Sequence, residues 1–331
     1  MLGENKRISD IYIIRRTINI IRTAKMKKQW YRVKTVNADS KKSNCIIYCA
    51  DGHIAHGGLA DRMYGIMALY ALCKIENVPF YINWCAPYNL LLFLVPNEYD
   101  WSIEKASVVY DIRFSVPRCL LGGAIRLPKN AVSLSRGKQV HAYCNFKNID
   151  FINKKYGTDF SYKELFHELF KLSPAFAKDL QNYKSQLPQQ YAGVQVRVLN
   201  AFGDFSDSVD NMLSDEERKL LITFCSKKIR QINDDTEKKV LFTSDSQILI
   251  DSIKKEFDSD DILLTIPGKI THSDFAGESD TTLYETHKKT FIDLFLLSGS
   301  THLYQIRNKH IYKSGFSILA AKISGKEIEF I

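Results

Sequence analysis

The second half of the chain alternates short apolar runs with longer segments whose apolar positions follow a helical period. The apolar runs predict strands at 191–198, 240–245, 262–266 and 301–306. The helical spacing predicts helices at 214–231, 247–257, 283–297 and 315–323. Strands that alternate with helices of this length are typical of a doubly wound parallel sheet. We therefore expect a Rossmann-like α/β domain over 187–331.

The first half shows similar elements in a less regular order. Its apolar runs predict strands at 45–49, 78–84, 107–114 and 139–144. Helices are predicted at 67–73, around 89–94, and at 162–171 and 175–186. These elements indicate an N-terminal α/β domain over 35–186, with 35–44 as a polar linker. Because ligands of open α/β sheets bind beyond the carboxyl ends of the strands, the residues that follow each strand are the candidates for chemistry.

Residues 1–34 form a basic segment. They hold ten lysines and arginines against two acidic residues, a net charge of +8, so the remaining 297 residues carry about +1. A nearly neutral body argues against nucleic-acid binding. Ile11, Ile14, Ile18 and Ile21 share one helical face, which allows two interpretations: a helix on an anionic membrane surface, or a helix packed on the protein's own core or on a partner subunit. No apolar run is long enough to span a bilayer, so we expect a cytoplasmic protein, at most peripheral on the inner face of the cytoplasmic membrane.

Neither a disulfide framework nor a metal site is expected. The seven cysteines are scattered, odd in number and mostly within apolar runs, which is typical of reduced core thiols. Cys45 and Cys49 have no second ligand pair nearby at metal-binding spacing. Asp258, Ser259 and Asp260 match the letters of a D-x-D motif, but their acidic helix-to-strand surroundings favour a solvated turn.

A glycine loop joins the first predicted strand of the body to its first helix. Gly57 and Gly58 let the backbone approach a ligand closely, and the helix start behind them presents N–H groups and a positive dipole end. The loop is neither a Walker A sequence nor a dinucleotide GxGxxG fingerprint. Asp61 and Arg62 add a charged pair, in which Asp61 is either a functional carboxylate or a helix cap.

Polar residues follow three predicted strands of the second half. Arg197 ends the first of them, and its planar, permanently charged guanidinium fits phosphate oxygens, with a surface salt bridge as the alternative role. Asp204 lies in the loop that follows. Ser244 and Asp245 end the next strand, where they would also suit a helix cap. His272 follows the third strand and is a candidate nucleotide contact.

Two segments near the C-terminus complete the candidate set. Asp293 lies on an otherwise apolar helix face, so it needs a partner, which is either structural or a nucleotide. At the start of the last predicted helix, hydroxyl and backbone N–H groups would form a phosphate cradle. The residues of this cradle are Ser314, Gly315, Phe316 and Ser317.

In this order the segments resemble the motifs of fucosyltransferase-like glycosyltransferases, especially bacterial ones of surface-polysaccharide pathways related to α-1,2- and α-1,6-fucosyltransferases. The glycine loop is similar to G-G-L-[GA]-[ND]-R-L-x-G, and the segment around Arg197 to H-x-R-x-G-D. Two departures concern that second motif, since Gln195 replaces its histidine and four residues separate Val198 from Gly203. Later segments are similar to T-[SD]-D, to H-x-D, and to the ending D-x-x-x-L-S … S-x-F-S-x-x-A.

The resemblance covers about 45–331 and implies a GT-B fold, two Rossmann-like domains facing a cleft. It implies a metal-independent, inverting transfer of fucose from GDP-fucose, a donor substrate and not a bound cofactor, to a hydroxyl of a glycan or lipid-linked oligosaccharide. Arg197 and Arg62 would then stabilise the diphosphate, and Asp61 or Asp204 would be the general base. Another nucleotide-sugar donor, or a catalytically silent, membrane-docked scaffold of a polysaccharide-synthesis complex, are the alternatives.

Overall fold

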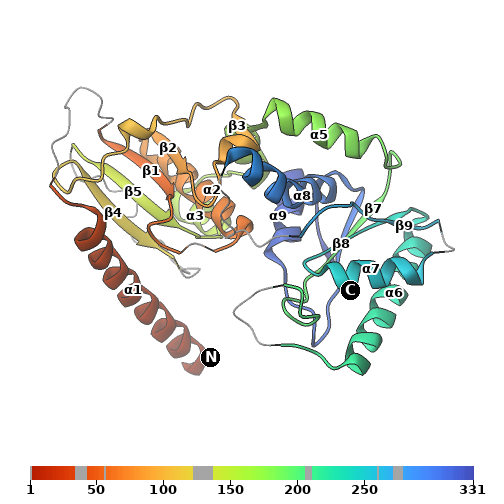
Figure 1. Cartoon of the computed structure of the whole chain (residues 1–331). Coiled ribbons are helices and arrows are strands. Elements are labelled where there is room, and N and C mark those ends of the chain that lie inside the picture. The colour runs from red at the N-terminus through yellow and green to blue at the C-terminus, as the bar shows by residue number, and fades with distance from the viewer. Residues whose placement is uncertain are drawn as a thin grey trace. The chain divides into compact units, whose positions relative to one another are not determined.

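The computed structural model describes residues 2–33, 43–55, 57–121, 137–205, 211–258, 261–270 and 279–331. The chain divides into two compact units, the first comprising Met1–Leu90 and Leu94–Lys171, the second Leu91–Phe93 and Leu172–Ile331 (Figure 1). The second unit therefore begins before the predicted boundary at 187. It takes in α5 (Pro174–Lys184) because Phe176 of this helix packs on Phe291 of the second unit.

The first unit is built on a parallel sheet of four strands in the order β2-β1-β5-β4. These are β1 (Cys45–Ala50), β2 (Phe80–Trp84), β4 (Ser115–Leu120) and β5 (Gln139–Cys144). Every residue of β1 and β5 is buried, as expected for central strands covered on both faces. Further elements are α2 (Leu59–Glu76), α3 (Ile149–Tyr156), α4 (Tyr162–Leu169), the short strand β3 (Leu94–Pro96) and the 3₁₀ turn Lys105–Ser107. The short strand β6 (Phe170–Leu172) and the 3₁₀ turn Leu90–Leu92 each contain residues of both units.

The strand predicted at 107–114 is wrong, and β4 begins immediately after it. Asp111 ends the extended run: its carboxylate accepts a hydrogen bond from the backbone N–H of Arg113 (2.9 Å), and its carbonyl accepts from Phe114 (2.9 Å) and Ser115 (2.8 Å). Such local bonds of an aspartate stabilise a turn in competition with a strand ladder. The pattern of apolar residues at 107–114 gives no sign of this competing turn.

Gly65 allows α2 to lie directly against the end of β5. A methyl group on Gly65 would be 1.9 Å from the carbonyl oxygen of Cys144, a backbone atom that cannot rotate away. We expect Gly65→Ala to destabilise the protein by about 3 kcal/mol or more, because helix and sheet must separate. Urea unfolding measures this, with Gly299→Ala as control, since its new methyl group would meet only the Tyr191 hydroxyl at 3.2 Å. Equal destabilisation by both variants would contradict the close approach.

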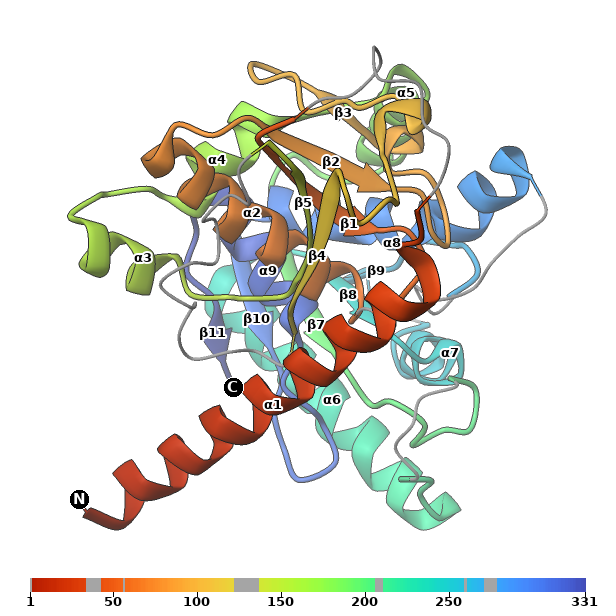
Figure 2. The ribbon, with the colours of Figure 1, turned by 90° about the vertical axis from the view of Figure 1, so that its left-hand side faces the viewer.

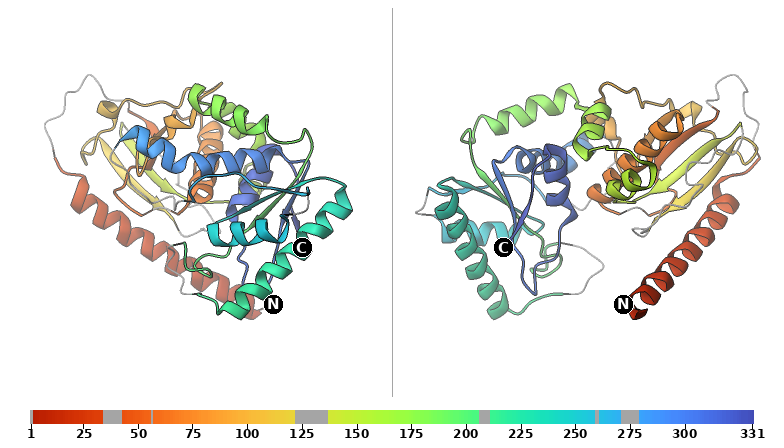
Figure 3. Two further views of the ribbon diagram at one scale, coloured as in Figure 1. Left: turned by 45° about the vertical axis from the view of Figure 1, so that its right-hand side comes forward. Right: turned by 180° about the vertical axis from the view of Figure 1, so that it is seen from behind.

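The second unit has the predicted doubly wound sheet, with all its strands parallel in the order β11-β10-β7-β8-β9. They are β7 (Ala192–Val196), β8 (Val240–Ser244), β9 (Leu263–Leu264), β10 (His302–Gln305) and β11 (Glu329–Phe330). The helices are α5, α6 (Asp215–Thr236), α7 (Gln247–Glu256), α8 (Asp280–Gly299) and α9 (Gly315–Ser324). Figure 3 shows α6 and α7 on one side of this sheet and α8 and α9 on the other. From β7 the chain adds β8 and β9 on one side, and it then adds β10 and β11 on the other side. The strand order therefore reverses between β7 and β10.

The basic segment forms α1 (Leu2–Trp30), and its C-terminal half packs along β4 (Figure 2). Asn19 donates its amide to the carbonyl of Leu121 (2.9 Å), and the Thr23 hydroxyl accepts from the Cys119 N–H (3.2 Å). Packing on the protein's own body is therefore confirmed for this half of the helix, although the isoleucine face does not mediate it. No described helix is both long and apolar enough to cross a bilayer. All seven cysteines are free thiols, and six of them are buried.

Candidate functional site

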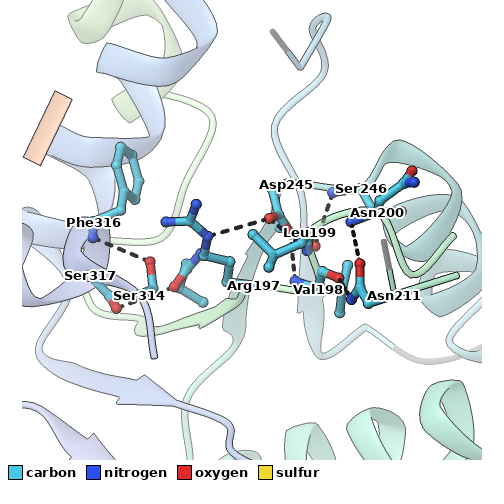
Figure 4. Close-up of polar contacts among 12 residues, drawn as sticks. Arg197, Val198, Leu199, Asn200, Asn211, Asp245, Ser246, Ser314, Phe316 and Ser317 are labelled. Carbon is cyan, nitrogen blue, oxygen red and sulfur yellow. Dashed lines mark hydrogen bonds and ion pairs between the residues drawn. The ribbon is translucent and has the colours of Figure 1, made fainter. Parts of the chain in front are cut away.

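Arg197 lies at the point of the second sheet where the strand order reverses. It follows β7, whose neighbour β10 leads into the segment before α9, and its carbonyl accepts the Tyr312 N–H (2.8 Å). Figure 4 shows the Arg197 side chain between the start of α9 and Asp245. Its Nε is 3.9 Å from Oδ2 of Asp245, and the side chain is 36% exposed. Crevices at such reversal points are where open α/β sheets bind ligands, so Arg197 is a partly exposed cation at the expected place.

Asp245 fixes the loop that follows Arg197. Its two carboxylate oxygens accept the backbone N–H groups of Val198 (2.8 Å) and Leu199 (3.0 Å), and Leu199 has a positive φ of 54°. Asn211 holds the same loop by donating its amide to the Val198 carbonyl (2.9 Å). Burial raises the pKa of Asp245 to about 6, although the two N–H donors and Arg197 oppose this shift. Asp245 is thus a positioning residue for Arg197.

Asp245→Asn is expected to flatten the pH dependence of stability between about pH 4 and pH 6. In the native protein the pKa of about 6 lies above the ordinary 3.8, so the native state holds this proton more tightly than the unfolded chain. Stability from this group is therefore greatest below about pH 4 and falls by about 3 kcal/mol as the pH rises to about 6. Urea unfolding of both proteins across this range measures the slope. An unchanged slope in the variant would exclude Asp245 as its source.

The two serines at the start of α9 form hydrogen bonds within the protein. Ser314 is fully buried, and its hydroxyl caps α9 by accepting the Phe316 N–H (3.2 Å). Ser317 is also fully buried, donating to the side-chain oxygen of Gln195 (3.3 Å) and accepting from the Gln305 amide (2.8 Å). This differs from the prediction that both hydroxyls contact phosphate directly. It also gives Gln195 a structural role, since it joins β7 to the start of α9.

Two other predicted residues serve the start of α7. The carboxylate of Asp204 accepts the hydroxyl of Ser246 (3.0 Å) and the N–H of Ile248 (2.8 Å), both through Oδ2. The buried hydroxyl of Ser244 accepts the Ser246 N–H (3.2 Å). Asp204 therefore stabilises the positive end of a helix, as carboxylates do at N-termini, and its role as a base stays a prediction. His272 lies outside the described residues.

Asp293 has a structural partner within its own helix. Lys289 donates to Asp293 Oδ2 at 2.5 Å, and both side chains are buried. Burial raises the pKa of Asp293 above its usual range, and the neighbouring ammonium opposes this shift. Within the described part of the chain, Oδ1 of Asp293 has no hydrogen-bond partner. The ion pair with Lys289 is a structural partner of the kind that the sequence led us to expect for Asp293. A contact between Asp293 and a nucleotide remains a proposal.

The first unit has its own reversal point, between β1 and β5. The glycine loop follows β1, and Lys147 follows β5. Lys147 bonds Asp61 through Nζ and Oδ1 at 2.5 Å, while Asp61 lies so close to Gly57 that a methyl group there would be 2.2 Å from Oδ2. Gly58 occupies the N-cap of α2 without a side chain to cap it. Sequence reasoning missed Lys147, because only the strand order brings it to the glycine loop.

Arg62 differs from its predicted role. Its side chain is buried, donating from Nε to the Gly57 carbonyl (3.0 Å) and from a terminal nitrogen to the Ala86 carbonyl (2.7 Å), and stacking 5.1 Å from the Trp84 ring centroid. These bonds fix the glycine loop to the turn after β2. Lys147, whose side chain is half exposed, is the cation that a ligand can reach beside Asp61.

Among the described residues, no group of three or more histidine, cysteine, aspartate or glutamate side chains is arranged to hold a metal ion. The D-x-D candidate at 258–260 falls partly outside the described residues.

The fold is that of the fucosyltransferase-like GT-B glycosyltransferases, as the sequence predicted. No family model and no curated protein matches the sequence. Among solved structures, a point mutant of Arabidopsis thaliana FUT1 in complex with GDP has a TM-score of 0.56 and 11% identity, over 93% of this chain and 73% of that one. The NodZ α-1,6-fucosyltransferase, from Bradyrhizobium, in crystals soaked with GDP-fucose, has a TM-score of 0.53 and 14% identity, over 85% of this chain and 93% of that one. At such low identity the likeness concerns the fold.

Proposed function

We propose that this protein is an inverting glycosyltransferase that transfers fucose from GDP-fucose to a glycan hydroxyl without a metal ion. The observation that carries the proposal is Arg197 at the β7/β10 reversal point, beside the N-terminus of α9. Of the two solved structures described above, one is a complex with GDP and the other comes from a crystal soaked with GDP-fucose. A diphosphate suits a guanidinium next to a helix N-terminus. By the resemblance of its motifs, the acceptor is a surface polysaccharide or its lipid-linked precursor.

The second unit would stabilise the leaving group. When the bond between C1 of fucose and the diphosphate oxygen breaks, the electron pair leaves with GDP. Arg197, oriented by Asp245, and the N-terminal dipole of α9 are fixed positive groups that stabilise this negative charge. Such groups supply the charge stabilisation that a divalent cation provides in other transferases, which is the reason for proposing a metal-independent reaction.

One of the two candidate carboxylates, Asp61 or Asp204, would act as the base. As the acceptor oxygen forms its bond to C1 from the face opposite the leaving group, its proton must pass to a base, and the anomeric configuration inverts. Asp61 is the better of the two candidates, because Asp204 already accepts two hydrogen bonds at the start of α7 through one oxygen. Lys147 orients the Asp61 carboxylate through an ion pair.

The proposal is tested by incubating the protein with GDP-fucose and lipid-linked oligosaccharides in the presence of a chelator and measuring GDP release and the labelled product. Fucosylated product with an inverted anomeric centre is expected. Activity only after addition of Mg²⁺ or Mn²⁺ would overturn the metal-independent mechanism. Turnover of UDP-sugars but not of GDP-fucose would assign a different donor. Failure to bind any nucleotide would favour the silent scaffold.

A further inference from the structure

The outward face of α1 carries an apolar stripe. Ile14, Ile18 and Ile21 follow one another at spacings of four and three residues, so they share one side of the helix. Their side chains are 58%, 41% and 50% exposed. Isolated exposed isoleucines are ordinary, but three in a row on one helix face are typical of a contact surface.

A different face of α1 attaches the helix to the first unit. Asn19, Thr23 and Met26 repeat the same spacing five residues further on, about 140° around the helix. They bond or pack against the end of β4 and the residue after it. The two faces are separate, so α1 can hold the first unit and a second surface at the same time.

The charge around the stripe has one sign. Residues 14–33 contain seven lysines and arginines and no aspartate or glutamate. Arg22, Lys25 and Lys28 are exposed and, by the helical period, lie on the same half of the helix as the isoleucines. An apolar stripe with cations beside it is the pattern of helices that lie in the boundary between lipid headgroups and acyl chains.

We infer that α1 docks the first unit on an anionic phospholipid surface, with Ile14, Ile18 and Ile21 inserted among the lipid chains. A second copy of the chain is disfavoured as the occupant, because it would bring the seven positive charges of residues 14–33 against the same seven, with no acidic residue in either segment. A protein interface would also be expected to offer aromatic anchors, whereas the stripe is aliphatic. The basic residues add attraction to anionic headgroups.

The C-terminal end of α1 is attached to the core of the first unit. At its C-terminal end, Trp30 stacks on His53 with ring centroids 4.3 Å apart, and the Tyr31 hydroxyl bonds His141 Nδ1 at 2.8 Å inside the core. His53 belongs to the segment between β1 and the glycine loop. Lipid contact through α1 would therefore give the first unit, with Asp61 and Lys147, a defined orientation to the membrane on which a lipid-linked acceptor resides.

Vesicle flotation of the full chain tests the inference. Wild type is expected to float with vesicles of phosphatidylcholine mixed with phosphatidylglycerol and to stay in solution with phosphatidylcholine alone. The triple variant Ile14→Ser/Ile18→Ser/Ile21→Ser should lower the partition coefficient about 100-fold or more. Arg22→Gln/Lys25→Gln/Lys28→Gln should lower it about 100-fold at low salt and remove most of its salt dependence.

The control variant removes three other exposed aliphatic side chains, Ile20→Ser/Met212→Ser/Leu220→Ser, and should float like wild type. Unchanged melting temperatures of all variants show that the fold is intact, since the substituted side chains are exposed. Flotation that is absent in wild type, or that survives loss of the stripe, would overturn the inference. Loss of a wild-type dimer in the stripe variant, without vesicle binding, would assign the face to a second copy. The outcome does not depend on the donor, so it is separable from the failure of the proposed transferase activity.

Discussion

Arg197→Ala is expected to weaken GDP binding about 100-fold or more and to abolish transfer. The guanidinium is a predicted phosphate ligand that is partly exposed at the β7/β10 reversal point. Loss of a charged, bidentate partner to a diphosphate costs about 3 kcal/mol or more, and the loss is larger in the transition state, where the leaving group gains charge. Calorimetric titration with GDP and a transfer assay measure the two effects.

Two further variants separate charge from geometry. Arg197→Lys keeps the positive charge but loses the planar fork, so its affinity for GDP should fall between those of wild type and Arg197→Ala. Arg230→Ala removes a different surface arginine of the second unit, which packs on Phe257, and should bind GDP normally. If Arg197→Ala and Arg230→Ala bind GDP equally well, the diphosphate is not held at this point of the sheet.

Asp61→Asn is expected to lower kcat about 100-fold to 10,000-fold while leaving GDP affinity unchanged. The amide keeps the size of the carboxylate but cannot accept the acceptor's proton, and general-base catalysis contributes effects of this order. Steady-state kinetics with GDP-fucose and an acceptor measure kcat, and calorimetry measures the donor affinity. This pairing distinguishes a catalytic base from a residue that only shapes the glycine loop.

The matched control is Asp150→Asn, which removes a carboxylate from the first turn of α3 in the same unit. It should leave kcat near the wild-type value. Lys147→Met should reduce kcat less than Asp61→Asn, because the carboxylate remains and loses only the partner that orients it. A nearly normal kcat for Asp61→Asn would transfer the role of base to Asp204.

The repeating pattern of the second unit made most of its elements predictable. Each buried strand there is a short apolar run, and the helices that separate the strands have their own signals, such as the capping box that Ser214 and Glu217 form at the start of α6. The position of Arg197 after β7 followed from that pattern. The role of Asp245 did not, because its bonds to Val198 and Leu199 join two strand ends that lie 46 residues or more apart in sequence.

The first unit was less predictable because its contacts are long-range. Lys147 meets Asp61 only because β5 lies next to β1, an order that no local pattern encodes. Arg62 has the charge of a ligand residue, but its bonds to the Gly57 and Ala86 carbonyls depend on tertiary structure. In α1 the isoleucine spacing predicted a helix face correctly, and burial shows that a different face packs on the protein.

Calorimetric titration with GDP-fucose in the presence of a chelator is the decisive test of the proposed donor site. We expect saturable binding to one site without a divalent cation, with UDP-sugars binding far more weakly. No binding of GDP or GDP-fucose under these conditions, by a protein that melts cooperatively, would contradict the proposal that Arg197 and the start of α9 form the site of a GDP-sugar donor.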